Sequence, residues 1–286
     1  MERSLEIKKA SILGMIGNIF LLIIKGIIGL ISGSSAMMLD AFNSAGDIFS
    51  SIMTFIGNKI ASKPSDDDHN LGHGKAEYIY SMLISIAIIL TSLLLLKKSL
   101  FTIINKTKYN FSYFLLIVCI LTIIVKLLLY LYTKNVYKKS KSILIKANSI
   151  DHRNDVILTT LNFISCLLAL KGIYFFDGVV GIIIALFIIY QSVKLFKESY
   201  DVLMDKSISE STKKEVFKII NSHKEIKKVI HFNSTPVGYK YQISFTIYVD
   251  GNMTTYESHD IANNLEKEID KKIDEIYLTV IHVNPI

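Results

Sequence analysis

Apolar residues recur in long runs as far as residue 197, and polar residues gather in the short stretches between them. Several runs approach or exceed the ~20 apolar residues that a helix needs to cross a bilayer. The pattern predicts a six-helix transmembrane bundle. The expected spans are residues 10–32, 35–60, 77–96, 111–132, 143–170 and 177–197. Because six is an even number, we expect both termini on the same side of the membrane.

From about residue 207 the pattern becomes that of a small soluble domain. Helical periodicity alternates there with strand-like runs, and the order αββαβ predicts a ferredoxin-like α+β sheet domain. The expected elements are a helix at Ser209–Asn221, strands at Val229–Ser234 and Tyr241–Val249 with a turn at 236–238 between them, a helix at Thr254–Lys271 and a strand at Ile276–Val283. We therefore expect two domains, 1–206 and 207–286. A domain as small as the second is marginally stable alone, which suits a dimerisation module.

Composition excludes an ordinary soluble protein, since 51% of the residues are hydrophobic and the mean hydropathy is +0.41. The net charge of +7 does not indicate a nucleic-acid partner, because the lysines lie mostly at helix ends, in a basic linker at 134–142 and in the C-terminal part. We expect a multi-pass protein of the plasma membrane with both termini in the cytoplasm. The Ile, Lys and Asn content is typical of an AT-rich bacterium. Lys25 and Lys126 lie near predicted helix ends, which favours snorkelling to the interface.

Acidic residues interrupt two of the predicted spans at regular spacing. Asp151 and Asp155 are four residues apart, as are Asn43 and Asp47, so each pair lies on one helix face with Cβ atoms about 5–6 Å apart. Ionisable groups at the centre of a membrane helix are unfavourable by at least ~2.5–3.5 kcal/mol each. The sequence therefore predicts a divalent cation held between the second and fifth helices. The alternative is that these carboxylates are hydrogen-bond partners between helices.

Four motifs, in this order, resemble the cation diffusion facilitator family over essentially the whole chain. They are Ser34-Ser-Ala36 through Asp40-Ala-Phe-Asn43-Ser-Ala-Gly-Asp47, then Asp66-Asp-Asp-His69-Asn-Leu-Gly-His73-Gly-Lys75-Ala-Glu77, then Ala147-Asn-Ser-Ile-Asp151-His-Arg-Asn-Asp155, and Leu203-Met-Asp205. The resemblance implies a homodimeric efflux transporter for divalent cations rather than an enzyme, with no catalytic cofactor.

The same resemblance implies a tetrahedral transport site made of Asn43, Asp47, Asp151 and Asp155. Zinc transporters of the family usually place His at one or two of these positions, whereas this chain offers only oxygen donors, which suit harder ions such as manganese. The set also resembles that of the manganese-exporting branch, so Mn²⁺ is favoured and Zn²⁺ or Fe²⁺ export is the alternative. His152 points about 100° away from Asp151 on a helical wheel and is expected outside the ligand set.

Keeping three carboxylates ionised in a low-dielectric site is energetically unfavourable unless a cation is present. We therefore expect loss of the metal to be accompanied by uptake of protons, that is, metal/proton exchange. A protein of another class, a non-transporting metal sensor or scaffold, remains an alternative. A metalloenzyme is disfavoured because the chain has no His-Glu-x-x-His helix and no nucleophile elbow.

Further metal sites follow from the resemblance. Asp66, His69 and His73 match a loop site, although a solvated acidic loop would look the same. His231, His259 and His282 match a site in the cytoplasmic domain, but Ser244 and Asn284 stand where zinc-binding relatives tend to have His and Asp. For each of these histidines, a lone core or surface residue is the alternative.

Lys75 and Asp205 correspond to a charge pair that links the membrane and cytoplasmic parts in relatives.

Overall fold

The structure is a computed structural model, and it describes residues 2–32, 35–105, 113–169 and 175–286. Some side chains within these ranges, among them that of Asn43, lie outside the described part. The chain divides into two compact units. We call Met1–Ser62 with Ala76–Tyr200 the helical unit, and Lys63–Lys75 with Asp201–Ile286 the C-terminal unit.

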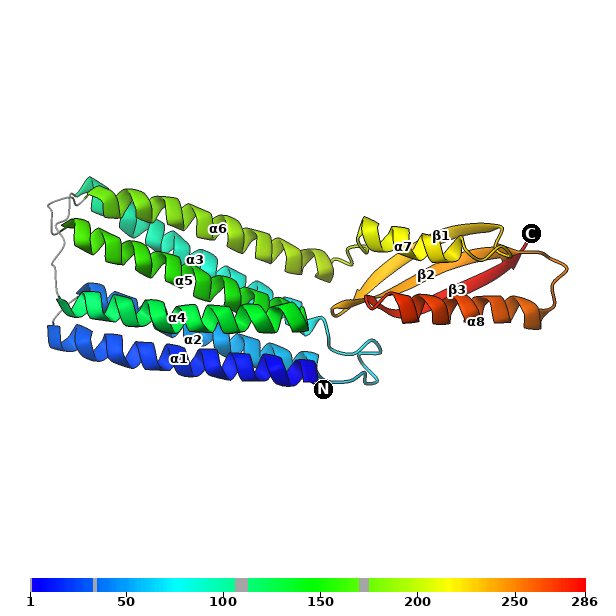
Figure 1. The fold of residues 1–286 in the computed structure, drawn as a ribbon, viewed down its shortest axis with the longest axis horizontal. Helices are drawn as coiled ribbons and strands as arrows, with labels where there is room; N and C mark the ends of the chain where they lie inside the picture. Colours follow the sequence, from blue (N-terminus) through cyan, green and yellow to red (C-terminus); the bar gives the residue numbers. More distant parts are fainter. Residues whose placement is uncertain (1, 33–34, 106–112, 170–174) are drawn as a thin grey trace. The chain divides into compact units, whose positions relative to one another are not determined.

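Six long helices run alongside one another in the helical unit (Figure 1). They are α1 (Glu2–Ser32), α2 (Ser35–Ala61), α3 (Ala76–Ile104), α4 (Tyr113–Ser140), α5 (Ile143–Ala169) and α6 (Phe175–Leu203), whose last residues belong to the C-terminal unit. Among the described residues, three segments are long and apolar enough to cross a membrane by length and composition. These segments are Glu2–Ile28, Ala76–Ile104 and Leu116–Ser140.

The helices extend beyond the apolar runs that predicted them, and the expected basic linker at 134–142 is largely helical. Helix α4 continues to Ser140 through Lys134 and Lys138. Lysine is a good helix former, so nothing in this stretch ends the helix where the apolar run ends. Only Lys141, which has a positive φ of 52°, and Ser142 separate α4 from α5. An apolar run thus measures the part of a helix suited to lipid, not the whole helix.

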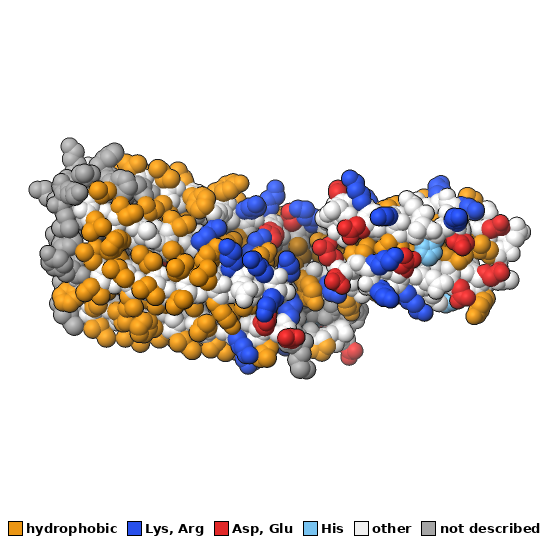
Figure 2. All heavy atoms as spheres, in the orientation of Figure 1, with side chains coloured by type: hydrophobic (Ala, Val, Ile, Leu, Met, Phe, Trp, Pro, Cys, Tyr) orange, Lys and Arg blue, Asp and Glu red, His pale blue; other side chains and the backbone are white. Residues whose placement is uncertain are grey.

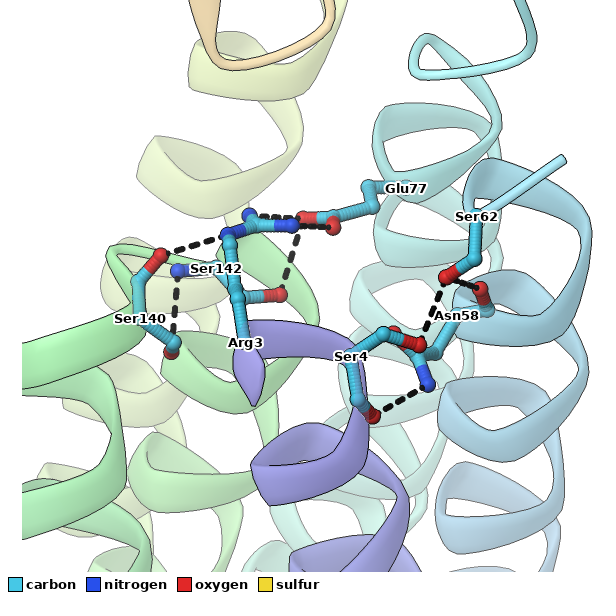
Figure 3. A network of polar contacts seen from close by, with 7 residues as sticks. All are labelled: Arg3, Ser4, Asn58, Ser62, Glu77, Ser140 and Ser142. Carbon is cyan, nitrogen blue, oxygen red and sulfur yellow. Dashed lines mark hydrogen bonds and ion pairs between the residues drawn. The ribbon is translucent and has the colours of Figure 1, made fainter. Parts of the chain in front are cut away.

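Apolar side chains cover much of the visible surface of the helical unit, and Lys and Arg gather toward one end (Figure 2). At that end, polar contacts tie several helices together (Figure 3). The Arg3 guanidinium contacts both carboxylate oxygens of Glu77 at 2.5 and 3.0 Å and donates to the Ser140 carbonyl at 2.8 Å. Ser142 donates to Glu77 at 2.8 Å. The buried Glu77 carboxylate thereby links the start of α1 to the start of α3 and to the α4–α5 junction.

The C-terminal unit contains a three-stranded sheet with two helices packed against it (Figure 1). Its elements are α7 (Glu210–Ile220), β1 (Lys228–Val237), β2 (Lys240–Val249), α8 (Thr255–Lys272) and β3 (Ile276–Pro285). The order αββαβ is as predicted. Strand β2 lies in the centre, antiparallel to β1 and parallel to β3. Alternate residues of β2 supply the buried core together with apolar residues of both helices: Ile243, Phe245, Ile247, Val216, Ile220, Leu265 and Ile269.

Strand β1 is longer than predicted because it includes Pro236, which was expected in a turn. Proline cannot donate to a strand ladder, but it is tolerated on an edge strand, and β1 is an edge. The turn instead lies at Gly238 and Tyr239, where Gly238 has a positive φ of 64°. The register of the β1–β2 pair shifts between Ile230 and Asn233, next to His231, which also has a positive φ.

Candidate metal centres

Helices α2 and α5 each carry acidic residues inside the helical unit. Asp47 lies in α2, and Asp151 and Asp155 lie one turn apart in α5. All three are buried, with 6%, 9% and 8% of their surface exposed. Asn43 lies one turn before Asp47 in α2, but its side chain is outside the described residues.

A lysine from a third helix joins the two acidic helices. Lys126 Nζ in α4 donates to Asp47 Oδ2 at 2.6 Å and to Asp155 Oδ2 at 2.5 Å. Lys126 is only 1% exposed. One ammonium group therefore bridges a carboxylate of α2 and a carboxylate of α5, and this contact brings Asp47 and Asp155 to a common point.

The snorkelling prediction for Lys126 and Lys25 is wrong. Lys126 lies near the middle of α4, because this helix continues to Ser140 instead of ending at 132. Lys25 is 2% exposed, and its Nζ donates to Ser44 Oγ in α2 at 3.2 Å. Both amines therefore remain inside the bundle, where carboxylate or hydroxyl oxygens meet them. Acidic residues in neighbouring spans were the signal in the sequence that these lysines had internal partners.

His152 lies closer to the acidic residues than the helical wheel suggested. A ring nitrogen of His152 and carboxylate oxygens of Asp151 and Asp155 lie within 4.8 Å of one another. The long imidazole side chain bridges the angle that separates neighbouring positions. His152 is 1% exposed, and neither ring nitrogen has a hydrogen-bond partner among the described residues. The ring is therefore an available nitrogen ligand beside the carboxylates.

Buried polar side chains continue from this cluster between α1, α2 and α5. Asn18 donates to Ser51 Oγ at 3.5 Å, and Thr54 donates to Asn148 Oδ1 at 3.1 Å. The oxygen of Asn18 and the amide nitrogen of Asn148 have no partner among the described residues. A polar region of this kind inside an apolar bundle can accommodate hydrated ions or protons.

The loop between α2 and α3 holds a second cluster, in the C-terminal unit. Asp66 Oδ1 accepts the backbone N–H of His69 at 2.7 Å and lies 3.1 Å from His69 Nδ1. His73 Nε2 lies 3.5 Å from Asp66 Oδ2. One ligand atom from each of these three residues lies within 4.8 Å of the others. Two imidazoles and a carboxylate form a donor set suited to zinc.

Electrostatics keeps the loop carboxylate ionised. Desolvation raises the pKa of Asp66, but the bonds from His69 and the nearby His73 and His69 charges outweigh it and lower the pKa from 3.8. Asp66 and His69 have side chains 52% and 57% exposed. The loop cluster thus presents a solvent-exposed, charged carboxylate as a candidate ligand for a cation.

The three histidines of the C-terminal domain do not come together. His231 lies on β1, His282 on β3 and His259 on α8, and all three are exposed. Within the described residues, none of them belongs to a group of three potential ligands. Lys75 and Asp205 do meet, with Nζ 2.7 Å from Oδ1 and side chains 38% and 58% exposed.

Two family profiles together match most of the chain. The profile described as the cation efflux transmembrane domain matches residues 11–204. The profile described as the cytoplasmic domain of cation efflux proteins matches residues 208–286.

Curated relatives resemble the chain from end to end. The manganese efflux system protein MneP of Bacillus subtilis is 28% identical, over 99% of this chain and 98% of its own. An uncharacterized transporter of Methanocaldococcus jannaschii is 30% identical, over 98% of both chains. The cation-efflux pump FieF of Shewanella oneidensis is 26% identical, over 98% of this chain and 94% of its own. A solved structure, the metal-bound C-terminal domain of the CzcD transporter from Thermotoga maritima, is 26% identical and covers 27% of this chain and 94% of its own, with a TM-score of 0.26.

Proposed function

This chain belongs to the cation efflux family, the cation diffusion facilitators, and from that premise we propose that it exports Mn²⁺ from the cytoplasm in exchange for protons. Members of the family are multi-pass membrane transporters and not enzymes. The proposed transport site consists of Asn43, Asp47, Asp151 and Asp155. The observation that carries it is the meeting of Asp47 from α2 and Asp155 from α5 at a single cationic group.

Donor chemistry favours manganese. Carboxylate and amide oxygens suit Mn²⁺ better than they suit zinc, which prefers imidazole and thiolate. The relative from Bacillus subtilis, named for manganese efflux, supports this choice. His152 supports the alternative, because one imidazole beside two carboxylates is also a donor set for Zn²⁺ or Fe²⁺.

Proton exchange follows from the charge of the buried cluster. Three carboxylates and a divalent ion lie in a region of low dielectric. Removing the ion leaves uncompensated negative charge, which is energetically unfavourable there. Protons would supply that compensation. Lys126 and Lys25 supply part of it already, so fewer protons are needed than the acidic residues alone suggest.

The remaining architecture of the proposal follows the family. All six long helices cross the plasma membrane, with both termini in the cytoplasm, and the C-terminal domain joins two copies into a homodimer. The loop cluster of Asp66, His69 and His73 is an accessory metal site. His231, His259 and His282 would bind metal only if the dimer assembled them with further ligands. The ion pair of Lys75 and Asp205 would act as a latch, that is, it would anchor the loop at 63–75.

The test is uptake of Mn²⁺, Zn²⁺ and Fe²⁺ into reconstituted vesicles under an imposed pH gradient, with Asp155→Ala as the inactive variant. We expect Mn²⁺ flux that needs the gradient and disappears in the variant. Preference for Zn²⁺ would favour the alternative ion and a role for His152. Metal binding without flux of any ion would contradict transport and favour a sensor.

A further inference from the structure

Lys126 lies at a particular position in the cluster. The need for a positive charge near the carboxylates does not by itself explain that position. A lysine that only balanced charge could lie anywhere near the three carboxylates. Instead, its Nζ lies within hydrogen-bonding distance of one oxygen from α2 and one from α5. This is the point at which an ion shared by Asp47 and Asp155 would also have to lie.

The ammonium and a metal ion cannot use these oxygens together. Carboxylate oxygens bind an ion such as Zn²⁺ at about 2.0–2.2 Å, slightly closer than they lie to the ammonium here. A metal held by both oxygens would therefore occupy almost the same position as Nζ. Like charges at such a distance in a buried site repel strongly.

The displaced ammonium would need another partner, because Lys126 is almost completely buried. Helix α4 offers one. Thr122 lies four residues earlier, on the same face of the helix, and is 1% exposed. Its Oγ1 has no hydrogen-bond partner among the described residues. The Thr122 hydroxyl oxygen, one turn away, can accept a hydrogen bond from the ammonium when the carboxylates bind metal.

We propose that the Lys126 ammonium and the transported divalent cation occupy the position between Asp47 and Asp155 in turn. Lys126 is then a tethered competitor that lowers the affinity for metal and helps to expel the ion. It also leaves a cation between α2 and α5 after the ion has gone. This inference rests on the proposed function, because it assumes that Asp47 and Asp155 bind the transported ion.

Calorimetric titration of Mn²⁺ into the full-length protein in lipid nanodiscs tests the competition. Lys126→Met keeps an unbranched side chain, shorter by one atom, and removes its charge, and we expect it to bind Mn²⁺ about tenfold tighter. Lys126→Arg keeps the charge and should bind within about threefold of the parent protein. Lys25→Met is the matched control, since it removes an equally buried charge that donates to Ser44. It should tighten binding much less than Lys126→Met.

Transport kinetics separate competition from a structural role. We expect Lys126→Met to lower both KM and kcat for Mn²⁺ uptake into vesicles, because the ion binds tightly and leaves slowly. A merely structural lysine would weaken binding when removed. If Lys126→Met cannot be purified, Thr122→Val provides the test, since it removes the alternative acceptor with little change of shape. We expect it to weaken Mn²⁺ binding severalfold, and unchanged binding would overturn the inference.

The outcomes distinguish the two proposals. If Asp155→Asn leaves Mn²⁺ binding intact, the transport site is wrong and the inference falls with it. If binding needs Asp155 but Lys126→Met binds Mn²⁺ no tighter than the parent, or tightens no more than Lys25→Met, only the inference is overturned.

Discussion

The helical unit buries its candidate metal ligands beside a lysine, whereas the C-terminal unit, which includes the loop at Lys63–Lys75, holds its own in the open. Asp47 and Asp155 are less than a tenth exposed and share the Lys126 ammonium. Asp66 is half exposed and contacts two histidines. Both clusters offer carboxylate oxygens, but only the carboxylate of the loop cluster is largely exposed to solvent.

This difference indicates different tasks. A buried anionic site must always have a cation, so binding and release of metal require another positive charge to move. An exposed site can lose its ion to water without such exchange, because water and salt screen the ligands that remain. The buried cluster is therefore suited to coupled transport and the exposed cluster to reversible, accessory binding.

The largest effect should come from Asp47→Asn. The amide keeps the shape but removes a carboxylate charge from the proposed transport site, so we expect the affinity for Mn²⁺ to fall roughly 100-fold or more and uptake to reach background. The same chemical change at Asp66 serves as the control and should leave uptake within about twofold. Equal losses in vesicle assays of the two variants would contradict the contrast between the clusters.

A stability test addresses the buried Glu77 carboxylate at the charged end of the bundle. Arg3→Ala leaves the Glu77 carboxylate buried without its guanidinium, and we expect the protein to lose about 3 kcal/mol of stability. Thermal unfolding in detergent measures the change. Arg3→Lys should recover only part of the loss, because lysine cannot make the two parallel contacts. An unchanged unfolding midpoint in Arg3→Ala would show that Glu77 does not depend on this partner.

The loop cluster should respond to pH in a defined direction. Because the folded-state pKa of Asp66 is lowered, its contribution to stability is present above the unfolded value and is lost only as the pH falls through the lowered pKa. We therefore expect Asp66 to remain a charged ligand for Zn²⁺ across the neutral and mildly acidic pH range.

Calorimetry of Zn²⁺ binding at several pH values checks this expectation. Asp66→Asn should remove one Zn²⁺ site, whereas the neighbouring Asp68→Asn should not. If Asp68→Asn had the larger effect, the cluster would be wrongly assigned.

The smallest effect should come from Lys75→Ala. The ion pair with Asp205 is exposed, and such pairs contribute about 0.2–1 kcal/mol. Hydrogen exchange of residues 63–75 in the parent and variant measures the change. Strong deprotection of this loop would instead indicate that the pair anchors it, as the proposed latch requires.

The sequence predicted the order of elements in the sheet domain correctly, and it placed Asp151 and Asp155 one turn apart on a helix. Both features depend on local periodicity. The sequence did not predict that Lys126 is buried, because that depended on where α4 ends. Apolar composition marks only the lipid-facing part of a helix. Helix spacing also misplaced His152, since its ring reaches farther than its direction on the helix suggests. The contact between Arg3 and Glu77 joins residues 74 positions apart, and no local spacing in the sequence indicates it.

One close approach in the C-terminal unit has an evolutionary consequence. A Cβ atom on Gly74, in the loop after His73, would lie 2.8 Å from the Cα of Gly238 in the β1–β2 turn. Backbone faces backbone there, so neither position tolerates a side chain unless the other segment moves. We therefore expect substitutions at the two positions to be coupled. A lineage that altered the hairpin turn would have to rebuild the histidine-bearing loop as well, so an accessory site would be inherited or lost together with that turn.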